Sequence, residues 1–541
     1  MDVREEDLIS GARSIEPRIG SVELLHATPA PYENAVATAM TCYSSRLIKT
    51  PEVSKDEKAI ARRDRIAERT FKAGHNTTLQ HNTFQFAFHG VSRYLLWTFL
   101  HDHPFYNSEQ VSQRYVRVSA EKVFTPPLSE RGRERFAAAV SDAAGTYHRL
   151  TEILEEPARD AYADVFTGRR LSLQAEGDKS RWHRDIVKKS QEVARYVLPL
   201  ATMAHLHHTV SGLTIHRYRR LSNTIECGTE MKLLIDSMVK EVVRHDPLFF
   251  SQAEDPLPLD ETPERRLLSR MFSSGPNAES KTTDWIRAFD KELSGRTSKL
   301  LDCSSNAEAT LARAVRTVMG AGSDTMSDDE AIRWALDPER NSHLCDSLNL
   351  STHGKLTKTL VHPHFTFARK LSLSADAQDQ RHRCVPGSRP LLASHFRPST
   401  PDYIVPTLVT KSAEAEDLYH GFMKRLWITL ATMLEEGEPM ESVLYLLPNA
   451  FPVRFEESGD LLSLRHKWAM RLCYNAQEEI WRASCDEVEQ VRAIFPRIGR
   501  WMLPPCGLRL AAGVKPFCPE GASYCGVRVW TMDLADYRRV I

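Results

Sequence analysis

The amino-acid sequence predicts an α/β (α+β) protein made of two similar lobes, each a mixed sheet with long flanking helices, docked as an intramolecular pseudo-dimer. Three observations support this prediction. Short segments alternate apolar and polar residues, as half-buried strands do, and longer segments place apolar residues at helical spacing. The same kinds of segment also recur in the same order in the two halves of the 541-residue chain, which indicates a tandem duplication.

The first repeated element is a strand followed by a helix. Residues 22–44 and 299–320 both read as a short strand ending in Leu-Leu, then a loop, then an alanine-rich helix. A second strand follows, and its alternating phenylalanines are Phe84, Phe86 and Phe88 in the first copy and Phe365 and Phe367 in the second. Further on, ARYVLP at 194–199 is echoed by VLYLLP at 443–448. These matches in the same order favour duplication over chance recurrence.

A long amphipathic helix is predicted near the end of the second copy. From Asp460 to Ile480 the apolar residues are spaced by three or four positions, which gives one stripe along a helix. Arg471 lies eleven residues after Asp460, and at about 100° per residue the two share a face. That face either borders a cleft or is the solvated edge of the core stripe.

The recurring segments divide the chain into parts. Between the copies the sequence is rich in Pro, Ser and charge, which predicts a linker with one helix, and the residues after the second copy show few periodic signals. The predicted parts are copy one at 1–250, the linker at 251–297, copy two at 298–500 and a cysteine-containing tail at 501–541.

Composition limits the classes of function. Lys plus Arg and Asp plus Glu both number 71, so the formal net charge is zero, which argues against a nucleic-acid coat or a polybasic membrane binder. No apolar run is long enough to span a membrane, and the acidic N-terminus has no apolar signal region. Ten cysteines are too dilute for a disulfide scaffold. We expect a cytoplasmic protein whose partners are small molecules, with neither nucleic acid nor a membrane among them.

Two short segments, 107–119 and 377–385, concentrate polar and basic residues. The first reads NSEQVSQRYVRVS, and its hydroxyl, amide and guanidinium groups suit a nucleotide phosphate or a uracil-like ring. The second reads AQDQRHRCV, and its two arginines around a histidine suit a pyrophosphate or a flavin ring. Each segment taken alone is also typical of an exposed loop. The candidate residues in the first segment are Ser108, Gln110, Ser112, Gln113, Arg114 and Arg117, gathered around Tyr115, and those in the second are Arg381, His382 and Arg383.

Three cysteines in the tail are candidate zinc ligands. Cys506, Cys518 and Cys525 lie among turn-forming Pro and Gly residues, and Cys485 or a histidine would serve as a fourth ligand. Their spacing matches no compact Cys-x-x-Cys pattern, so we predict buried free thiols and no metal site.

Taken together, these motifs resemble the flavin-dependent thymidylate synthases, the ThyX family. That family has an Arg-His-Arg triplet followed by Ser-x-Arg-Tyr. A His-containing segment and a Phe-x-Phe strand lie upstream, and an Ala-Arg-x-Val-Leu-Pro segment and a helix that carries an arginine lie downstream. Copy one has GHNTTLQH at 74–81, FQF at 84–86, Ser92-Arg93, SQRYV at 112–116 and ARYVLP at 194–199. Copy two has FTF at 365–367, QDQRHR at 378–383, Arg471 and AQEEI at 476–480.

Each copy lacks what the other keeps. In copy one the triplet position reads Asp102-His103-Pro104, and Ser222 occupies the position of the helix arginine. In copy two Ser-x-Arg-Tyr is absent, Leu444 replaces the arginine of Ala-Arg-x-Val-Leu-Pro, and Leu356 stands where copy one has His75. This complementary loss favours one surviving composite site between two ThyX-like lobes. The competing explanation is decay of both copies into a scaffold.

The resemblance implies an activity and a set of site residues. The reaction is the reductive methylation of dUMP to dTMP, with FAD as cofactor and NADPH and methylenetetrahydrofolate as co-substrates. The family is homotetrameric with sites between subunits, so a homodimer of this chain would be the equivalent assembly. The implied catalytic residues are Arg471 and Arg381, and the implied substrate-binding residues are Gln110, Ser112, Arg114, Arg195, Gln378 and Arg471. The implied cofactor-binding residues are His75, Arg381, His382, Arg383 and His466.

The resemblance leaves two functions open. The first is the enzyme, in which a guanidinium stabilises the charge that develops on the uracil as its C5 atom attacks. The second is a non-catalytic divergent paralogue that binds flavin or nucleotide, or that pairs with an authentic synthase. A flavin spectrum of the purified protein distinguishes a flavoprotein from a bare scaffold.

Overall fold

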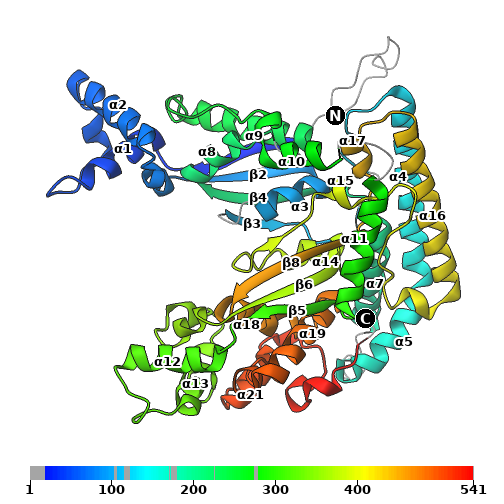
Figure 1. Ribbon diagram of the computed structural model, residues 1–541. Coiled ribbons are helices and arrows are strands. Elements are labelled where there is room, and N and C mark those ends of the chain that lie inside the picture. Colours follow the sequence, from blue (N-terminus) through cyan, green and yellow to red (C-terminus); the bar gives the residue numbers. More distant parts are fainter. Residues whose placement is uncertain are drawn as a thin grey trace.

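Two separate four-stranded sheets, one in each half of the chain, confirm the expected two-lobed α/β fold (Figure 1). The computed structural model describes residues 19–102, 106–114, 118, 122–169, 171, 179–223, 226–272, 278–539 and 541. The first sheet has the order β1 (Ser21–Ala27), β2 (Thr83–Ser92), β4 (Met203–Ser211) and β3 (Tyr106–Gln110). The second has the order β5 (Ser298–Cys303), β6 (His364–Ser372), β8 (Pro452–Asp460) and β7 (Gly387–Ser388).

The strand pairs in both described sheets are antiparallel, so the expectation of mixed sheets is wrong in this detail. The reason is that the helices between β2 and β4 bring the chain back to the same end of the sheet at which β2 finishes. Ser92, the last residue of β2, pairs with Met203, the first residue of β4. A parallel pair would need a crossover to the opposite end. The two copies even share an irregularity, because the register shifts by one residue after Leu24 in one sheet and after Leu300 in the other.

Helices connect and follow the strands in both copies. In copy one they are α1 (Pro31–Thr41), α2 (Glu57–Lys72), α3 (Arg93–Asp102), α4 (Glu130–Ile153), α5 (Glu155–Val165), α7 (Lys179–Ala194), α8 (Gly212–Arg220) and α9 (Gly228–His245). In copy two they are α12 (Ala307–Met319), α13 (Asp328–Leu336), α14 (Leu373–Asp379), α15 (Leu392–His395), α16 (Ala413–Glu435), α17 (Met440–Leu444), α18 (Leu461–Arg471), α19 (Glu478–Ile494) and α20 (Pro496–Gly499). None of the helices in the described part of the chain is long and apolar enough to cross a lipid bilayer.

The segments outside the two copies are more structured than the sequence predicts. Residues 251–297, where one helix was expected, contain α10 (Pro263–Phe272) and α11 (Ala278–Leu293). Asp290 of α11 forms ion pairs with Arg454 on β8, at 2.7 Å, and with Lys370 on β6, at 2.8 Å, and so fastens the segment to the second sheet. The tail contains helix α21 (Pro505–Ala511).

The two copies are docked against each other as an intramolecular pair. The long helices α4 and α16 lie side by side at the right of Figure 1 and are joined by ion pairs. Arg149 lies 2.7 Å from Glu414, and Arg425 lies 2.9 Å from Asp142. One hydrophobic core runs through both copies, so the apolar driving force for folding is shared between them.

An approximate two-fold axis relates the copies where ARYVLP meets VLYLLP. Pro199 and Pro448 form an isolated antiparallel bridge there. The hydrogen bonds on either side exchange under a half turn, as in an isologous dimer interface. They are the N–H of Leu200 to the carbonyl of Leu447, at 2.9 Å, and the N–H of Asn449 to the carbonyl of Leu198, at 2.8 Å.

Two buried glutamates obey the same symmetry. Glu230 accepts hydrogen bonds from Ser92 Oγ of its own copy, at 2.6 Å, and from Tyr445 Oη of the other copy, at 2.9 Å. Glu479 likewise accepts from Ser372 Oγ, at 2.7 Å, and from Tyr196 Oη, at 2.5 Å. Each carboxyl group therefore ties a strand end of one copy to a tyrosine of the other.

The Glu230 carboxyl makes stability depend on pH. Burial raises the pKa of Glu230 from 4.5 to about 7, so the folded protein holds a proton that the unfolded chain has released. Stability should therefore fall as the pH rises from about 4.5 through about 7. We expect Glu230→Gln, which cannot ionise, to flatten the fall in Tm measured between pH 4.5 and 8. The control is Glu241→Gln on the same helix, where the native glutamate pairs with Arg244. If the Tm of Glu230→Gln falls as steeply with pH as that of the wild type, the raised pKa of Glu230 is not the cause.

The helix predicted from Asp460 to Ile480 is in fact two helices. Helix α18 ends at Arg471, α19 begins at Glu478, and residues 472–477 form a loop. In a continuous helix the carbonyl groups of this loop would accept hydrogen bonds from backbone N–H groups of the next turn. Here two of them accept hydrogen bonds from side chains that are distant in the sequence. Arg114 Nη2 donates to the carbonyl of Asn475, at 2.9 Å, and Arg539 Nη2 donates to that of Ala476, at 2.8 Å. Tertiary hydrogen bonds therefore override a strong helical pattern.

Candidate active site between the two copies

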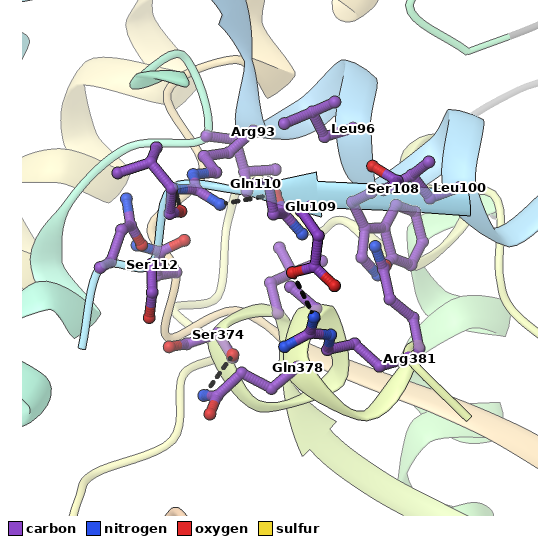
Figure 2. Close-up of a pocket in the computed structure, with 18 of the residues that line it drawn as sticks. Arg93, Leu96, Leu100, Ser108, Glu109, Gln110, Ser112, Ser374, Gln378 and Arg381 are labelled. Atoms are coloured by element: carbon purple, nitrogen blue, oxygen red, sulfur yellow. Dashed lines mark hydrogen bonds and ion pairs between the residues drawn. The ribbon is translucent and has the colours of Figure 1, made fainter. Parts of the chain in front are cut away.

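A cavity of about 150 Å³ lies where the end of β3 in copy one faces α14 of copy two (Figure 2). Figure 2 shows Gln110 and Ser112 on one wall, with Gln378 and Arg381 on the other. Six residues proposed from the sequence line this cavity. They are Gln110, Ser112 and Arg195 from copy one and Gln378, Arg381 and Arg383 from copy two.

Arg93 holds the copy-one wall in place. It begins α3, directly after strand β2, and its Nη1 donates to Gln110 Oε1 at 2.9 Å. Its Nη2 donates to the carbonyl of Val111 at 2.7 Å, which fixes the start of the loop that carries Ser112. Burial, with the positive charge of Arg195, lowers the pKa of Arg93 to about 10. The sequence shows the Ser92-Arg93 pair, but the motifs did not predict that Arg93 belongs to the site.

Polar atoms without partners surround the cavity. Buried polar groups in native proteins are nearly always hydrogen-bonded, so a concentration of unpaired ones indicates a ligand or bound water. Among the described residues, the lining atoms that are buried and have no partner are Arg93 Nε, Ser108 Oγ, Gln113 Nε2, Arg195 Nη2, Ser374 Oγ and Gln380 Oε1. These donors and acceptors come from both copies, so one polar molecule at the seam could form hydrogen bonds with groups of each copy.

A buried basic cluster adjoins the cavity on the copy-one side. Glu192 forms an ion pair with Arg114 and lies 3.5 Å from Lys189 Nζ. Although burial alone would raise it, the pKa of Glu192 is held well below its usual range by Arg114, Lys189 and Arg195. Burial lowers the pKa of Lys189 to about 8. One carboxylate thus faces three cations, and this excess of positive charge favours an anionic ligand.

Arg195 is the cation of this cluster that is most available to a ligand. Its side chain is buried, with the residue 3% exposed, and Nε donates to the carbonyl of Glu192 at 3.1 Å. Its Nη2 has no partner within the described residues. Burial, together with Arg114, lowers the pKa of Arg195 despite the opposing charge of Glu192. An unpaired buried guanidinium is costly to keep unless something binds it.

The proposed catalytic arginine is largely buried and not on a solvated cleft edge. The Arg471 side chain is 14% exposed, donates through Nη2 to the carbonyl of Gln378 at 2.8 Å, and lies 3.3 Å from Asp379. Burial lowers its pKa, and Asp379 partly opposes this. The rings of His382 and His466 meet edge to face beside it, with centroids 5.9 Å apart. Burial and Arg471 lower the pKa of His382, which keeps that ring neutral.

Residues from both copies meet at the mouth of the cavity. Arg381 of copy two forms an ion pair with Glu109 of copy one at 2.6 Å, and both side chains are exposed. Arg383 lies over the ring of Tyr106, 4.7 Å from its centroid. Sequence reasoning missed Glu109 and Tyr106. Glu109 belongs to the NSEQ segment and could have been noticed there, whereas Tyr106 had no signal.

Several proposed residues do not line this cavity. Arg114, Arg471, His382, His466 and His75 are not among its lining residues. His75 is exposed and follows α2, which lies in the arm at the left of Figure 1, away from β3 and α14. His103 and Pro104 of the copy-one triplet position, like Tyr115 and Arg117 of the polar loop, lie outside the described residues.

At the opposite pairing of the copies, charged and aromatic side chains contact one another directly. The strand register puts Gly387 where Ser108 lies in the other sheet, which makes Arg389 the counterpart of Gln110. Arg389 pairs with Asp376 at 2.9 Å, and Trp97 Nε1 donates to the same carboxylate at 2.8 Å.

The tail cysteines form no recognisable metal site. Among the residues that the structure describes, no group of three His, Cys, Asp or Glu side chains is placed to hold a metal ion. Burial raises the pKa of Cys506 and of Cys525 to about 12, so both remain thiols near neutral pH.

Two copies of one α/β unit, meeting around a cluster of arginines and unpaired polar atoms, define a fused pseudo-dimer with a polar, arginine-rich cavity at its seam. The family model described as thymidylate synthase complementing protein (Thy1) matches residues 23–248 and 299–497. The match covers more than half of the chain in two segments, so the protein belongs to this family and contains two copies of its unit.

Individual relatives are distant. The chain is 26% identical over 234 residues to the flavin-dependent thymidylate synthase of Clostridium tetani, covering 42% of this chain and 84% of that protein. It is 27% identical over 229 residues to that of Nitratidesulfovibrio vulgaris, covering 41% and 81%. The crystal structure of a UMP/dUMP methylase PolB from Streptomyces cacaoi bound with 5-Br dUMP is 16% identical, covers 44% of this chain and 96% of that chain, and has a TM-score of 0.30. A score this low carries no argument about function.

Proposed function

We propose that the chain is a flavin-dependent thymidylate synthase that methylates dUMP to dTMP at the single composite seam described above. The observation that carries this proposal is the gathering of the retained motifs of both copies around one cavity whose buried polar atoms lack partners. At the opposite seam Asp102-His103-Pro104 stands in place of the arginine triplet, and Arg389 is already paired with Asp376 at 2.9 Å. The relatives that match this chain are flavin-dependent thymidylate synthases.

The nucleotide phosphate would bind at the copy-one side of the cavity. Guanidinium groups bind phosphate oxygens through charge-assisted hydrogen bonds, and Arg195 has an unpaired Nη2 for this purpose. Arg114 would adjust its ion pair with Glu192 to share the anion. Gln110 and Ser112, on the lip of the same wall, would bind the sugar and phosphate.

The uracil would lie toward copy two, where Gln378 and Arg471 are adjacent. Gln378 Nε2 donates to Gln477 Oε1 at 2.7 Å and could turn to a uracil carbonyl. The C5 atom is nucleophilic when the uracil is in an anionic, enolate-like form, in which a carbonyl oxygen carries negative charge. Arg471 would stabilise that anion, with Arg381 as the second cation. The methylene carbon of methylenetetrahydrofolate becomes the new methyl group, and NADPH is the net reductant.

The residues at the mouth fit a flavin. His382 is half-buried and its buried Nε2 atom has no partner within the described part of the chain, while Arg381 and Arg383 supply fixed positive charge beside it. The cavity, about 150 Å³, is smaller than the roughly 300–1,000 Å³ of ordinary ligand sites. FAD would therefore lie at the mouth, against Arg381, His382, Arg383 and His466, and when bound it supplies hydride transfer.

A second chain would complete the flavin site. His75 resembles a flavin-binding residue of the family, yet it follows α2, which lies away from α14, the helix directly before the triplet. We propose a homodimer, equivalent to the family's tetramer, in which His75 of one chain reaches Arg381–Arg383 of the other. Light scattering of the purified protein should give twice the mass of the chain.

The proposed function has a direct test. We expect protein supplied with FAD to show a flavin spectrum and to oxidise NADPH only when dUMP and methylenetetrahydrofolate are both present, with dTMP as product. The gene should also relieve the thymidine requirement of an auxotroph. Folded protein that binds flavin or dUMP without forming dTMP would favour the non-catalytic paralogue, and folded protein that binds neither would leave only a scaffold.

A further inference from the structure

The C-terminal tail lies outside the matched family segments, which end at residue 497, yet it packs into the core that the two copies share. Cys525, Val529, Tyr537 and Ile541 are buried there. The Tyr537 ring stacks on Trp481 of α19 with centroids 6.4 Å apart. On the copy-one side, the carbonyl of Ala522 accepts from Arg169 Nη1 at 2.8 Å. The tail therefore bridges both copies near the candidate site.

One target of the tail is the loop 472–477, which interrupts the predicted helix directly after Arg471. Arg539 Nη2 donates to the carbonyl of Ala476 at 2.8 Å. Asn475 Nδ2 donates to the carbonyl of Ser523 at 2.8 Å, and the backbone N–H of Arg538 donates to Tyr474 Oη at 3.2 Å. Three consecutive loop residues are thus tied to the tail.

The same loop contacts residues proposed to bind the nucleotide. Arg114 Nη2 donates to the carbonyl of Asn475, next to the carbonyl that Arg539 holds. Gln477 Oε1 accepts from Gln378 Nε2 at 2.7 Å, and Gln477 Nε2 donates to Tyr196 Oη at 2.6 Å. The loop therefore lies between the tail on one side and Arg114 and Gln378 on the other.

Arg539 has the contacts of a residue that is held in one position. It is 5% exposed, its guanidinium carbon lies 5.1 Å from the centre of the Trp481 ring, and Nε and Nη2 both donate to the backbone oxygen of Ile541, at 3.0 and 2.8 Å. A buried guanidinium that serves only stability is often no better than an apolar side chain of similar size. Its hydrogen bond to the loop gives a reason for its presence.

We propose that the tail is a positioning clamp for the nucleotide site, in which Arg539 fixes loop 472–477 and the loop in turn holds Arg114 and Gln378. This inference rests on the proposed function, since it takes dUMP as the ligand whose binding the clamp supports. Arg539 is a positioning residue, because Arg114, Asn475 and Ala476 stand between it and the cavity. The proposal differs from a merely stabilising tail, which would leave nucleotide affinity unchanged in folded protein.

The test compares Arg539→Gln with Arg509→Gln in the full chain. Arg509 is also a tail arginine, but its Nε donates to the carbonyl of Pro516 at the surface, away from the loop. Hydrogen exchange is measured over residues 472–477, where the Ala476 N–H bonds to the carbonyl of Cys473 at 2.9 Å. The affinity for dUMP is measured by calorimetry, and Arg539→Lys, which keeps a cationic donor, tests for rescue.

We expect Arg539→Gln to speed exchange in the loop and to weaken dUMP binding about tenfold, the effect of losing a hydrogen bond from a charged group. Arg539→Lys should recover part of the affinity, and Arg509→Gln should change neither quantity. If Arg539→Gln does not fold, Asn475→Ala, which removes the hydrogen bond to Ser523, replaces it and should shift both readouts in the same direction.

The outcomes separate the two proposals. Unchanged exchange in the loop of Arg539→Gln would overturn the clamp, and so would faster exchange with unchanged affinity for dUMP. Wild-type protein that binds no dUMP would overturn the proposed function and the clamp's role in substrate binding. Exchange would then still show whether the tail orders the loop.

Discussion

Arg471→Ala should lower the rate of dTMP formation about 10²–10³-fold, the usual effect of removing one donor that stabilises charge in a transition state. The structure supports Arg471 as that donor because its Nε and Nη2 are held by Asp379 and the carbonyl of Gln378, which fixes the guanidinium beside a proposed uracil-binding residue. The measurement is the rate of dTMP formation at saturating dUMP, together with the Tm of each variant.

The control for this prediction is Arg482→Ala. Arg482 lies on α19, is partly exposed and pairs with Glu478, so its removal should leave the rate unchanged. Ser222→Arg would place an arginine at the position in copy one that corresponds to Arg471. It is not a neutral control, because Ser222 is 1% exposed and an arginine there would overpack the core. A wild-type rate in folded Arg471→Ala protein would exclude the proposed catalytic role.

Arg195→Ala should weaken dUMP binding by about 1.5–3 kcal/mol, or roughly tenfold to 150-fold, because it removes a charge-assisted contact to the phosphate. Stability should respond differently. Arg195 is a buried cation with an unpaired Nη2, so its removal should leave the Tm of the free protein unchanged or raise it. Calorimetry with dUMP and thermal unfolding without it measure the two effects separately.

Arg149→Ala is the matched control for Arg195→Ala. Arg149 pairs with Glu414 at 2.7 Å between α4 and α16, and both side chains are exposed. Exposed ion pairs contribute little to stability, so neither quantity should change. If Arg195→Ala has a lower Tm but an unchanged affinity for dUMP, Arg195 is a structural residue and does not bind the substrate.

Sequence motifs predicted part of the candidate site. The sequence identified Arg195 and Arg381 as parts of one site although 185 intervening residues separate them. The structure brings both to the lining of one cavity between the copies. Glu109 and Tyr106 were missed since an ion pair or ring contact across a seam leaves no pattern in either partner's local sequence.

The sequence by itself determined the duplication, the family and the strands whose phenylalanines alternate, because these depend on local periodicity and on the order of motifs along the chain. Only the tertiary structure decided the antiparallel sheets, the break after Arg471, the burial of that arginine and the remote place of His75. Each of these depends on which surfaces pack together over long sequence separations. At residues 472–477 the hydrogen bonds from Arg114 and Arg539 outweigh a helical pattern, because a backbone carbonyl accepts whichever donor the fold brings to it.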